Sequence, residues 1–507
     1  MKKTAFLLMI IAVLSKVTGF LRDITLSYFY GATSTSDAYI ISITITSVLF
    51  SLIILGISTA YIPMFKQIEH EKGHPSALHF TNNLITIVVM ITTVVIVLGF
   101  CFSHSIVKLF AFGFDGATLE TAILFTQIGL LGIYFTSLTQ LFTSFLQLKG
   151  KFIIPAMIGL PFNVIIIISI MISDQLDILF LAIGSVMAAI IQMLFLFPAL
   201  RKTNYRYVPT VNFADKHIKK LFVLVLPVMI GISIDQINLM VDKSISSTVT
   251  EGGISALTYA SRLNDFVQGI FVISFVSVMF PLISNMAAEK NMKDFKASIG
   301  DVLSTITVIV VPASVGVMIL AEPIIQLLFG RGHFDALAIE MTAHALFFYS
   351  IGMIGYAFRE ILNRAFYSLQ DSKTPMYNAA IAVFCNIVLN LILSFFMGIS
   401  GLALATSISA LFCSTLLFIN LRRKIGEFGL KRMLITFGKV LAASTVMGVV
   451  VYGLNGYVLF AWNPLIKMAT VVSSGVVVYF LFLNLLKVNE SKLIMRYVRQ
   501  RVLSFRK

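Results

Sequence analysis

Four basic residues lie inside segments that are apolar enough to cross a lipid bilayer: Lys16, Arg22, Lys243 and Arg262. A cation at mid-membrane costs about 2.5 to 3.5 kcal/mol on insertion scales, so the four together oppose assembly by roughly 10 kcal/mol. That cost is offset where the side chains face water, a partner or an anionic ligand. The four cations are therefore the first candidates for a binding site.

Acidic residues accompany the first two cations. In a helix, Lys16, Gly19 and Asp23 fall at i, i+3 and i+7 and share one face. Arg22 then points about 120° away from Lys16, and a bend at Gly19 would let both cations reach one cavity. The alternative is that Asp23 and Asp37 merely neutralise them. We favour a binding role, because such pairs add little net stability.

Two later segments, 221–247 and 253–287, carry a second polar set. It comprises Asp235, Asn238 and Asp242 on one helix face of the first segment, and the i, i+3 pair Arg262 and Asp265 on the second. With the first set, these residues predict a polar, net cationic central cavity. Lys243 lies near the outer end of its segment, where a side chain reaching out to the interface explains it as well as a ligand-binding role does.

A further charged group lies in the segment 338–367. Glu360 and Arg364 are spaced i, i+4 in the favourable order, and Arg359 lies one turn from Asn363. The group is close to the predicted cytoplasmic end of its segment. We therefore favour a structural brace or a gate over a binding site.

The composition indicates what kind of protein positions these residues. Of the 507 residues, 58% are hydrophobic and only 12% are charged, against about 25% charged in soluble domains. This predicts an all-α polytopic membrane protein. The three cysteines fall inside apolar runs, and neither a metal motif nor a Gly-rich phosphate loop is present. We expect no cofactor and no ATP hydrolysis, and we expect a transporter rather than an enzyme.

Fourteen apolar runs are long enough to cross about 30 Å of hydrocarbon. They lie at residues 5–29, 35–65, 80–103, 119–147, 153–173, 177–199, 221–247, 253–287, 298–320, 338–367, 375–397, 400–421, 433–455 and 463–486.

The basic residues indicate the orientation of these spans. With the N-terminus in the cytoplasm, most of the 38 Lys and Arg residues fall on the cytoplasmic side, whereas Lys108 and Arg331 fall in outer loops. This satisfies the positive-inside rule and predicts both termini inside. The net charge of +15 is thus a topology signal and does not indicate nucleic acid. The basic tail, 488–507, is predicted to lie on membrane lipids as an amphipathic helix.

An internal repeat organises the spans. Pro63 recurs as Pro281 at an offset of 218 residues, and Asn163 recurs as Asn386 at an offset of 223. Six spans separate the copies, so the repeat is parallel, with its axis along the membrane normal. The predicted domains are an N-lobe (1–200), a basic linker (201–220), a C-lobe (221–424), two further spans (425–487) and the tail (488–507). Paired six-helix lobes are typical of alternating-access transporters.

The charged motifs resemble a known family. Residues 15–23 (SKVTGFLRD), 36–39 (SDAY), 255–263 (SALTYASRL) and 359–375 (REILNRAFYSLQDSKTP) are similar to those of the MurJ (MviN) lipid II flippases of the MOP exporter superfamily. The resemblance covers essentially the whole chain. It implies a protein of the bacterial cytoplasmic membrane that moves an undecaprenyl-pyrophosphate-linked peptidoglycan precursor to the outer leaflet.

The resemblance also implies a site. The family's essential cavity cations fall on Lys16, Arg22 and Arg262, and its first-lobe acid falls on Asp37. Two positions differ. The family usually has Arg in place of Lys16, which keeps the charge but loses bidentate phosphate geometry. The basic motif of the second span is here residues 47–51 (SVLFS), without a cation.

Other functions remain open at this stage. The missing cation leaves room for a different polyprenyl-linked oligosaccharide, and an ion-coupled drug exporter of the same superfamily is a second alternative. A glycosyltransferase would need acidic residues on large outer loops, and a scaffold leaves the buried cations unexplained. Without an ATP site, the membrane potential or an ion gradient must provide direction, through an unspecified coupling cation. We expect a monomer, with cell-wall synthesis proteins as candidate partners.

Overall fold

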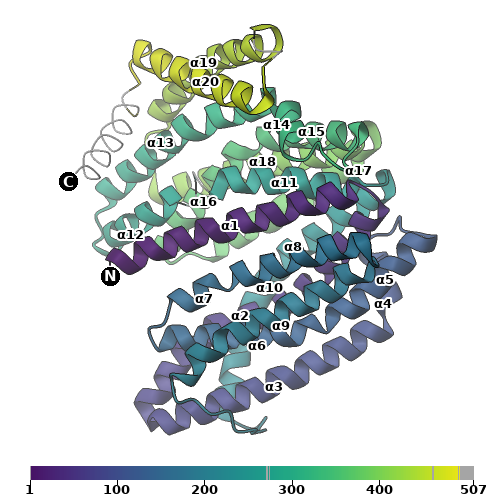
Figure 1. The fold of residues 1–507 in the computed structure, drawn as a ribbon. Coiled ribbons are helices and arrows are strands. Elements are labelled where there is room, and N and C mark those ends of the chain that lie inside the picture. Colours follow the sequence, from purple (N-terminus) through teal and green to yellow (C-terminus); the bar gives the residue numbers. More distant parts are fainter. Residues whose placement is uncertain (1, 270–271, 273, 459–461, 489, 491–507) are drawn as a thin grey trace. The chain divides into compact units, whose positions relative to one another are not determined.

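The computed structural model of the chain describes residues 2–269, 272, 274–458, 462–488 and 490. Within these residues every regular element is a helix, as Figure 1 shows. The predicted all-α class is confirmed for this part of the chain. Most of the predicted lipid-bound tail, 488–507, lies outside the described residues.

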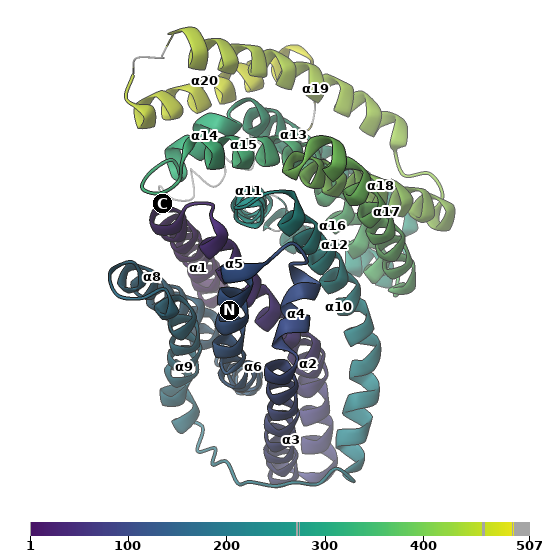
Figure 2. The same cartoon turned by 90° about the vertical axis from the view of Figure 1, so that its right-hand side faces the viewer.

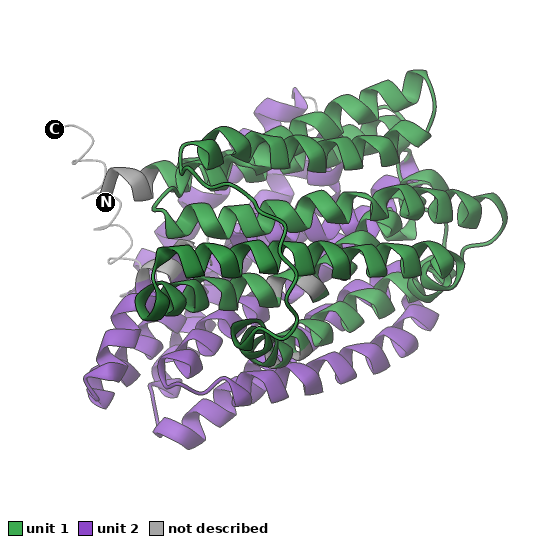
Figure 3. Cartoon of the chain, turned by 90° about the horizontal axis from the view of Figure 1, so that it is seen from below, with its two compact units in different colours: residues 1–255, 331–335 green, residues 256–330, 336–507 purple. Residues whose placement is uncertain are grey.

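The chain divides into two compact units, coloured separately in Figure 3. Unit 1 comprises residues 1–255 and 331–335, and unit 2 comprises residues 256–330 and 336–507. Unit 1 contains the helices α1 (Lys2–Tyr30), α2 (Ser34–Lys72), α3 (His74–Cys101), α4 (Ser103–Phe110), α5 (Gly116–Leu130), α6 (Gly132–Leu148), α7 (Ile153–Met157), α8 (Gly159–Gln175), α9 (Leu179–Arg201) and α10 (Lys216–Val249).

The remaining helices belong to unit 2, apart from the first turn of α11. They are α11 (Gly253–Gln268), α12 (Ser274–Ala288), α13 (Met292–Ile319), α14 (Ala321–Leu328), α15 (Ala336–Ile351), α16 (Met353–Ser368), α17 (Lys373–Met397), α18 (Ile399–Ile425), α19 (Leu430–Gly453), the π-helix η2 (Leu454–Val458) and α20 (Pro464–Leu485).

Ten helices in the described residues are long and apolar enough to cross a membrane, or twelve if two bent pairs each count as one span. The bends are 50° within α10 and 45° between α15 and α16. The polytopic character predicted from composition is thus confirmed. Helix α1, which carries Arg22, is not among these spans. Helix α11, which carries Arg262, and helix α12 are not among them either.

Aromatic side chains stack on one another within the largely aliphatic core of unit 1. Helix α2 packs against both α3 and α10, and the three helices run side by side in Figure 2. Tyr61 of α2 stacks on Phe80 of α3 with ring centroids 6.2 Å apart, and Phe65 meets Phe145 of α6 edge-on. In lipid such tight packing, rather than escape from water, drives helix association. The repeat predicts α10 as the first span of the C-lobe, and that lobe division stays a prediction.

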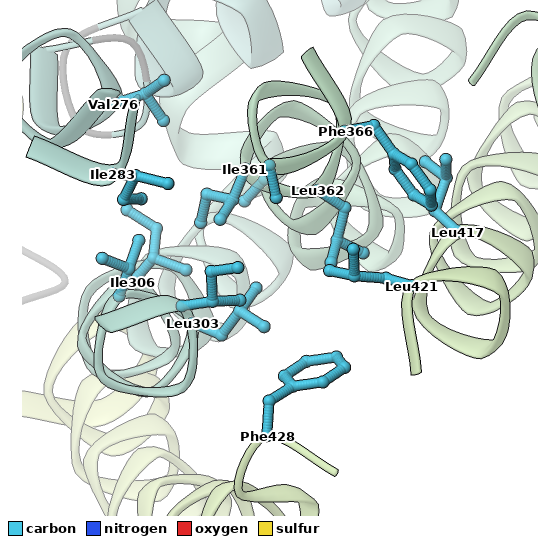
Figure 4. Packing of buried hydrophobic residues seen from close by; sticks show 14 of the residues in the cluster. Val276, Ile283, Leu303, Ile306, Ile361, Leu362, Phe366, Leu417, Leu421 and Phe428 are labelled. Carbon is cyan, nitrogen blue, oxygen red and sulfur yellow. The ribbon is translucent and has the colours of Figure 1, made fainter. Parts of the chain in front are cut away.

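Aliphatic residues of α13, α16 and α18 form the core of unit 2. Figure 4 shows Leu303 of α13, Leu362 of α16 and Leu421 of α18 in one cluster, with Phe428 beside them. The backbones of α16 and α18 approach so closely at Gly355 that a Cβ on this residue would lie 2.7 Å from the amide nitrogen of Leu411. Small residues permit this close contact between helices in membranes.

Candidate functional site

The guanidinium of Arg22 is held from two sides within unit 1. Its Nε and Nη2 donate to Oδ1 of the neighbouring Asp23, at 3.0 and 2.8 Å. Its Nη1 donates to Oδ1 of Asn163 on α8 at 3.3 Å. The Arg22 side chain keeps 21% of its surface exposed. An arginine has five N–H donors, so two of them are not used in these bonds.

Asn163 is a residue of this site that sequence reasoning missed, since we used it only as a marker of the repeat. Its side chain is buried and also donates to Oγ1 of Thr18 at 3.3 Å and to the carbonyl of Ser15 at 3.4 Å. Gly19 faces it, and helix α1 continues unbroken through Gly19. The sequence signal that could have found it is an amide side chain in a largely apolar segment, because such a group must find a hydrogen-bond partner when it is buried.

Arg22 also lines a cavity of about 270 Å³ within unit 1. Hydroxyl groups supply most of the other polar lining, from Ser42, Thr46, Ser47, Thr136 and Ser185. Apolar side chains such as Phe125 and Phe162 complete the wall. Ser47 begins the segment that lacks the family's cation, so this segment does reach a cavity wall shared with Arg22. The cavity thus offers one cation and several hydroxyls to a ligand.

Asp37, predicted to contact substrate, is buried in a hydrogen-bonded cluster at the start of α2. Its Oδ1 accepts hydrogen bonds from the backbone nitrogen of Ser255, at 2.7 Å, and from the hydroxyl of Ser255. Ser36 and Ser255 share a further hydroxyl contact at 2.8 Å. Lys243 lies at the same cluster and donates to the carbonyl of Ile254 at 3.5 Å. With 9% of its surface exposed, Lys243 is buried here rather than extended to the interface.

Four turns of unit 1 meet around this cluster: residues 31–34, 111–115, 247–255 and 331–335. We call them the outer turns, after the side of the membrane that the sequence predicts for them. The backbone nitrogen of His333 donates to Tyr28 at 2.9 Å, and that of Gly113 donates to the hydroxyl of Ser247 at 2.9 Å. Gly252 has φ +73°, and a Cβ there would overlap the carbonyl of Ala32. The outer turns are therefore locked by backbone contacts as well as by Asp37.

The other predicted cavity residues lie on exposed helix faces. Lys16 of α1, Asp235 of α10, and Arg262 and Asp265 of α11 are exposed. Asp242 is half-buried and accepts from Asn238 at 3.3 Å. Arg22 belongs to unit 1 and Arg262 to unit 2, so their meeting at one ligand stays a prediction.

The charged group on α16 forms the contacts that its spacing predicts. Nη2 of Arg364 lies 3.9 Å from Oε2 of Glu360, and its guanidinium lies 5.5 Å from the ring centre of Phe280. Arg359 stacks over Tyr356 at 5.1 Å, while its buried Nε has no hydrogen-bond partner among the described residues. Its role as a brace or gate stays a prediction.

In the described part of the chain, no three His, Cys, Asp or Glu side chains are grouped so as to hold a metal. The coupling cation suggested by the sequence is therefore left without an assigned site.

Comparison with known families adds the decisive observation. The family described as "Lipid II flippase MurJ" matches residues 26–473. This chain belongs to the MurJ family. The match includes Asp37, Arg262 and the 359–375 motif but begins after Lys16 and Arg22, so the assignment of those two cations depends on the 15–23 motif.

Individual MurJ relatives support the assignment. A protein of Vibrio cholerae named "Probable lipid II flippase MurJ" is 30% identical over 466 residues, 88% of this chain and 87% of the relative. One of Thermotoga maritima with the same name is 29% identical and covers 95% of this chain and 96% of its own. As a family member with many apolar helices, this chain is a multi-pass protein of the bacterial cytoplasmic membrane.

Solved structures agree on the fold. A structure titled "Lipid II flippase MurJ, inward closed conformation" is 26% identical, covers 94% of this chain and 98% of its own, and has a TM-score of 0.81. An inward-facing MATE multidrug transporter of the MOP superfamily has a TM-score of 0.69 at 13% identity, covering 83% of this chain and 98% of its own. The second likeness shows a shared fold alone. MurJ is a flippase family, not a family of catalytic enzymes.

Proposed function

We propose that this chain is a lipid II flippase, which moves the undecaprenyl-pyrophosphate-linked peptidoglycan precursor from the inner to the outer leaflet by alternating access. Family membership supports the substrate class. The observation that carries the proposal is Arg22, an arginine on a cavity wall within an apolar helical unit. Its two unused N–H donors suit a phosphate oxygen, because charge-assisted bonds from arginine are strong and directional.

Arg22 is held in position before a ligand binds. Asp23 and Asn163 hold the guanidinium in place, so little side-chain entropy is lost when a ligand binds. The lipid tail can stay in the bilayer while the diphosphate is bound by the cation. Lys16 and Arg262, both exposed, would complete the phosphate site once the ligand has entered.

The outer turns suggest how access is controlled. In the proposed orientation, with both termini inside and fourteen spans, the end of α1 and the start of α2 face outward. The bonds from Ser255 to Asp37 would then close the outer end, and they must break for release. We thus assign Asp37 to closing the outer end rather than to binding the substrate.

Direction must come from a gradient or from the membrane potential. Moving one charge through 100 mV is worth about 2.3 kcal/mol, which is enough to bias the two access states. We propose that the protein acts as a monomer, that the lobes 1–200 and 221–424 are the moving bodies, and that Glu360 and Arg364 brace the cytoplasmic end of α16.

The test is transport of a fluorescent lipid II analogue in liposomes by variants of Arg22. Arg22→Ala should slow transport at least about tenfold, because charge-assisted hydrogen bonds worth about 1.5 to 3 kcal/mol are lost. Arg22→Lys should retain part of the activity, since it keeps the charge but not the fork of donors. The matched control is Arg206→Ala, an exposed arginine of the linker. Unchanged transport by Arg22→Ala would refute the assignment.

A second substrate has one observation in its favour. Ser47, on the cavity wall, stands in the segment where a cation is expected, so one phosphate contact is missing. A polyprenyl diphosphate bearing a different glycan would then be the cargo. Native mass spectrometry of the purified protein would identify the glycan directly, and a bound lipid II would exclude this alternative.

A further inference from the structure

Unit 2 contains a second cavity, of about 540 Å³, that the proposed transport does not use. Its lining comes from the start of α13 and from the turn between α18 and α19, and its charged residues are Lys293, Lys296, Asp301, Glu427 and Arg432. We infer that this cavity binds a phosphate-bearing anion at the level of the cytoplasmic lipid headgroups. The inference does not depend on the proposed flippase function.

The cavity is a built feature because its walls are fixed. Helix α18 ends at Ile425, and the turn to α19 passes through Gly426 and Gly429, with φ values of +84° and +89°. A Cβ on Gly300 of α13 would lie 2.8 Å from the carbonyl oxygen of Phe428, so the turn touches the helix backbone. The Phe428 ring is buried in the unit 2 core (Figure 4). The turn is therefore anchored at Phe428, both to the backbone of α13 and to the core of unit 2.

The acidic residues of the lining are already paired. Arg432 binds Asp301 and Glu490, each at 2.9 Å. Glu427 binds Arg422 at 2.5 Å. Within the described ranges, the positive charges of Lys293 and Lys296 are not balanced in this way.

Among the described residues, neither Lys293 nor Lys296 has an acidic partner. Lys296 is half-buried, and its Nζ lies over Gly426, 3.3 Å from where a Cβ would stand. Gly429, which caps the start of α19 and lines the cavity, has no side chain that could accept a hydrogen bond from the first amides of that helix. In this part of the structure, two ammonium groups without acidic partners line the same cavity as the start of α19, and both features favour an anion.

The length of α13 places the cavity relative to the bilayer. Its 28 residues span about 42 Å, whereas the hydrocarbon is about 30 Å thick. For a helix along the membrane normal, about 12 Å, or roughly eight residues, extends beyond the hydrocarbon. The distribution of basic residues predicts that these are residues 292–299, on the cytoplasmic side, where phospholipid phosphates lie. An acidic phospholipid is thus the nearest source of the anion, and free phosphate is the other.

A simpler explanation is that Lys293 and Lys296 serve only the positive-inside rule. That rule requires charge on the correct side but does not require the charges to line a fixed cavity. The two explanations differ in what happens when the same charge is removed elsewhere on the cytoplasmic face. Lys216 and Lys219, exposed at the start of α10, provide that matched control.

The experiment measures binding of phosphatidylglycerol to the purified full-length protein by native mass spectrometry, with phosphatidylcholine as the neutral lipid. Lys293→Gln combined with Lys296→Gln should weaken phosphatidylglycerol binding by about tenfold or more, given the usual contribution of a lysine near an anionic lipid. Ala297→Phe, which fills the cavity without changing charge, should weaken it as well. The control pair Lys216→Gln and Lys219→Gln should bind like the wild type.

A second arm of the experiment adds inorganic phosphate alone and measures the shift in thermal unfolding temperature. If phosphate stabilises the wild type but not the lysine pair, and the lipid arm shows no difference, the site stands and its anion is a soluble phosphate. If the cavity variants match the wild type in both arms, or the control pair loses as much binding as the lysine pair, the inference is wrong. Unfolding temperatures without anion show whether each variant is folded.

Discussion

Removing the amide of Asn163 tests whether α8 positions Arg22. In Asn163→Ala the bond to Nη1 of Arg22, at 3.3 Å, disappears together with those to Thr18 and Ser15. Interhelical hydrogen bonds in membranes average about 0.6 kcal/mol and reach about 1.7. If that energy orients Arg22 for its ligand, transport should slow by about threefold to twentyfold. Asn163→Asp should slow it further, because a carboxylate at that distance would pair with Arg22 and compete with the diphosphate.

The assay is the initial rate of transport of fluorescent lipid II in liposomes, with lipid II binding by native mass spectrometry alongside it. The control is Asn386→Ala, since Asn386 is the repeat-related amide on α17 and bonds to Asn390 at 3.0 Å. Both alanine variants lose a buried amide, but only Asn163→Ala loses the contact to Arg22. Equal transport by the two variants, with both folded, would refute the positioning role.

Three further predictions follow from single contacts. Gly252→Ala should lower the thermal unfolding temperature more than Gly116→Ala. Both glycines have positive φ, but only at Gly252 would a Cβ overlap another part of the backbone. Equal decreases in unfolding temperature would contradict the locking of the outer turns. Burial alone would raise the pKa of Asp371, but hydrogen bonds from Lys424 and Thr374 lower it to about 2. The ionised Asp371 should therefore stabilise the fold above about pH 4 and lose this effect as the pH falls toward 2. The unfolding temperature of Asp371→Asn should drop less over that range than that of the wild type, and an equal drop would contradict the prediction. Ser47→Arg should tighten lipid II binding in native mass spectrometry by about tenfold, the value of one added charge-assisted bond, whereas unchanged binding would show that the segment 47–51 does not reach the diphosphate.

Several properties of this protein follow from the sequence alone, because they depend on residue types and short spacings. The low charge content and long apolar runs determine a helical membrane protein. The cost of a cation in lipid marks Lys16, Arg22 and Arg262 as candidates for a binding role, and the motifs around them indicate the family. The pair of Glu360 and Arg364 follows from helical spacing, since i, i+4 neighbours lie on the same face.

Only the tertiary structure decided which distant residues meet. Asn163 lies 141 residues from Arg22, and Ser255 lies 218 from Asp37, so neither contact can be read from helical periodicity. The structure shows Asp37 buried and bonded where sequence reasoning predicted a substrate contact. The cavity of unit 2 likewise forms because one glycine turn brings residues 427–432 against the start of α13. Packing between helices, which depends on small residues and on buried polar groups finding partners, determines these sites.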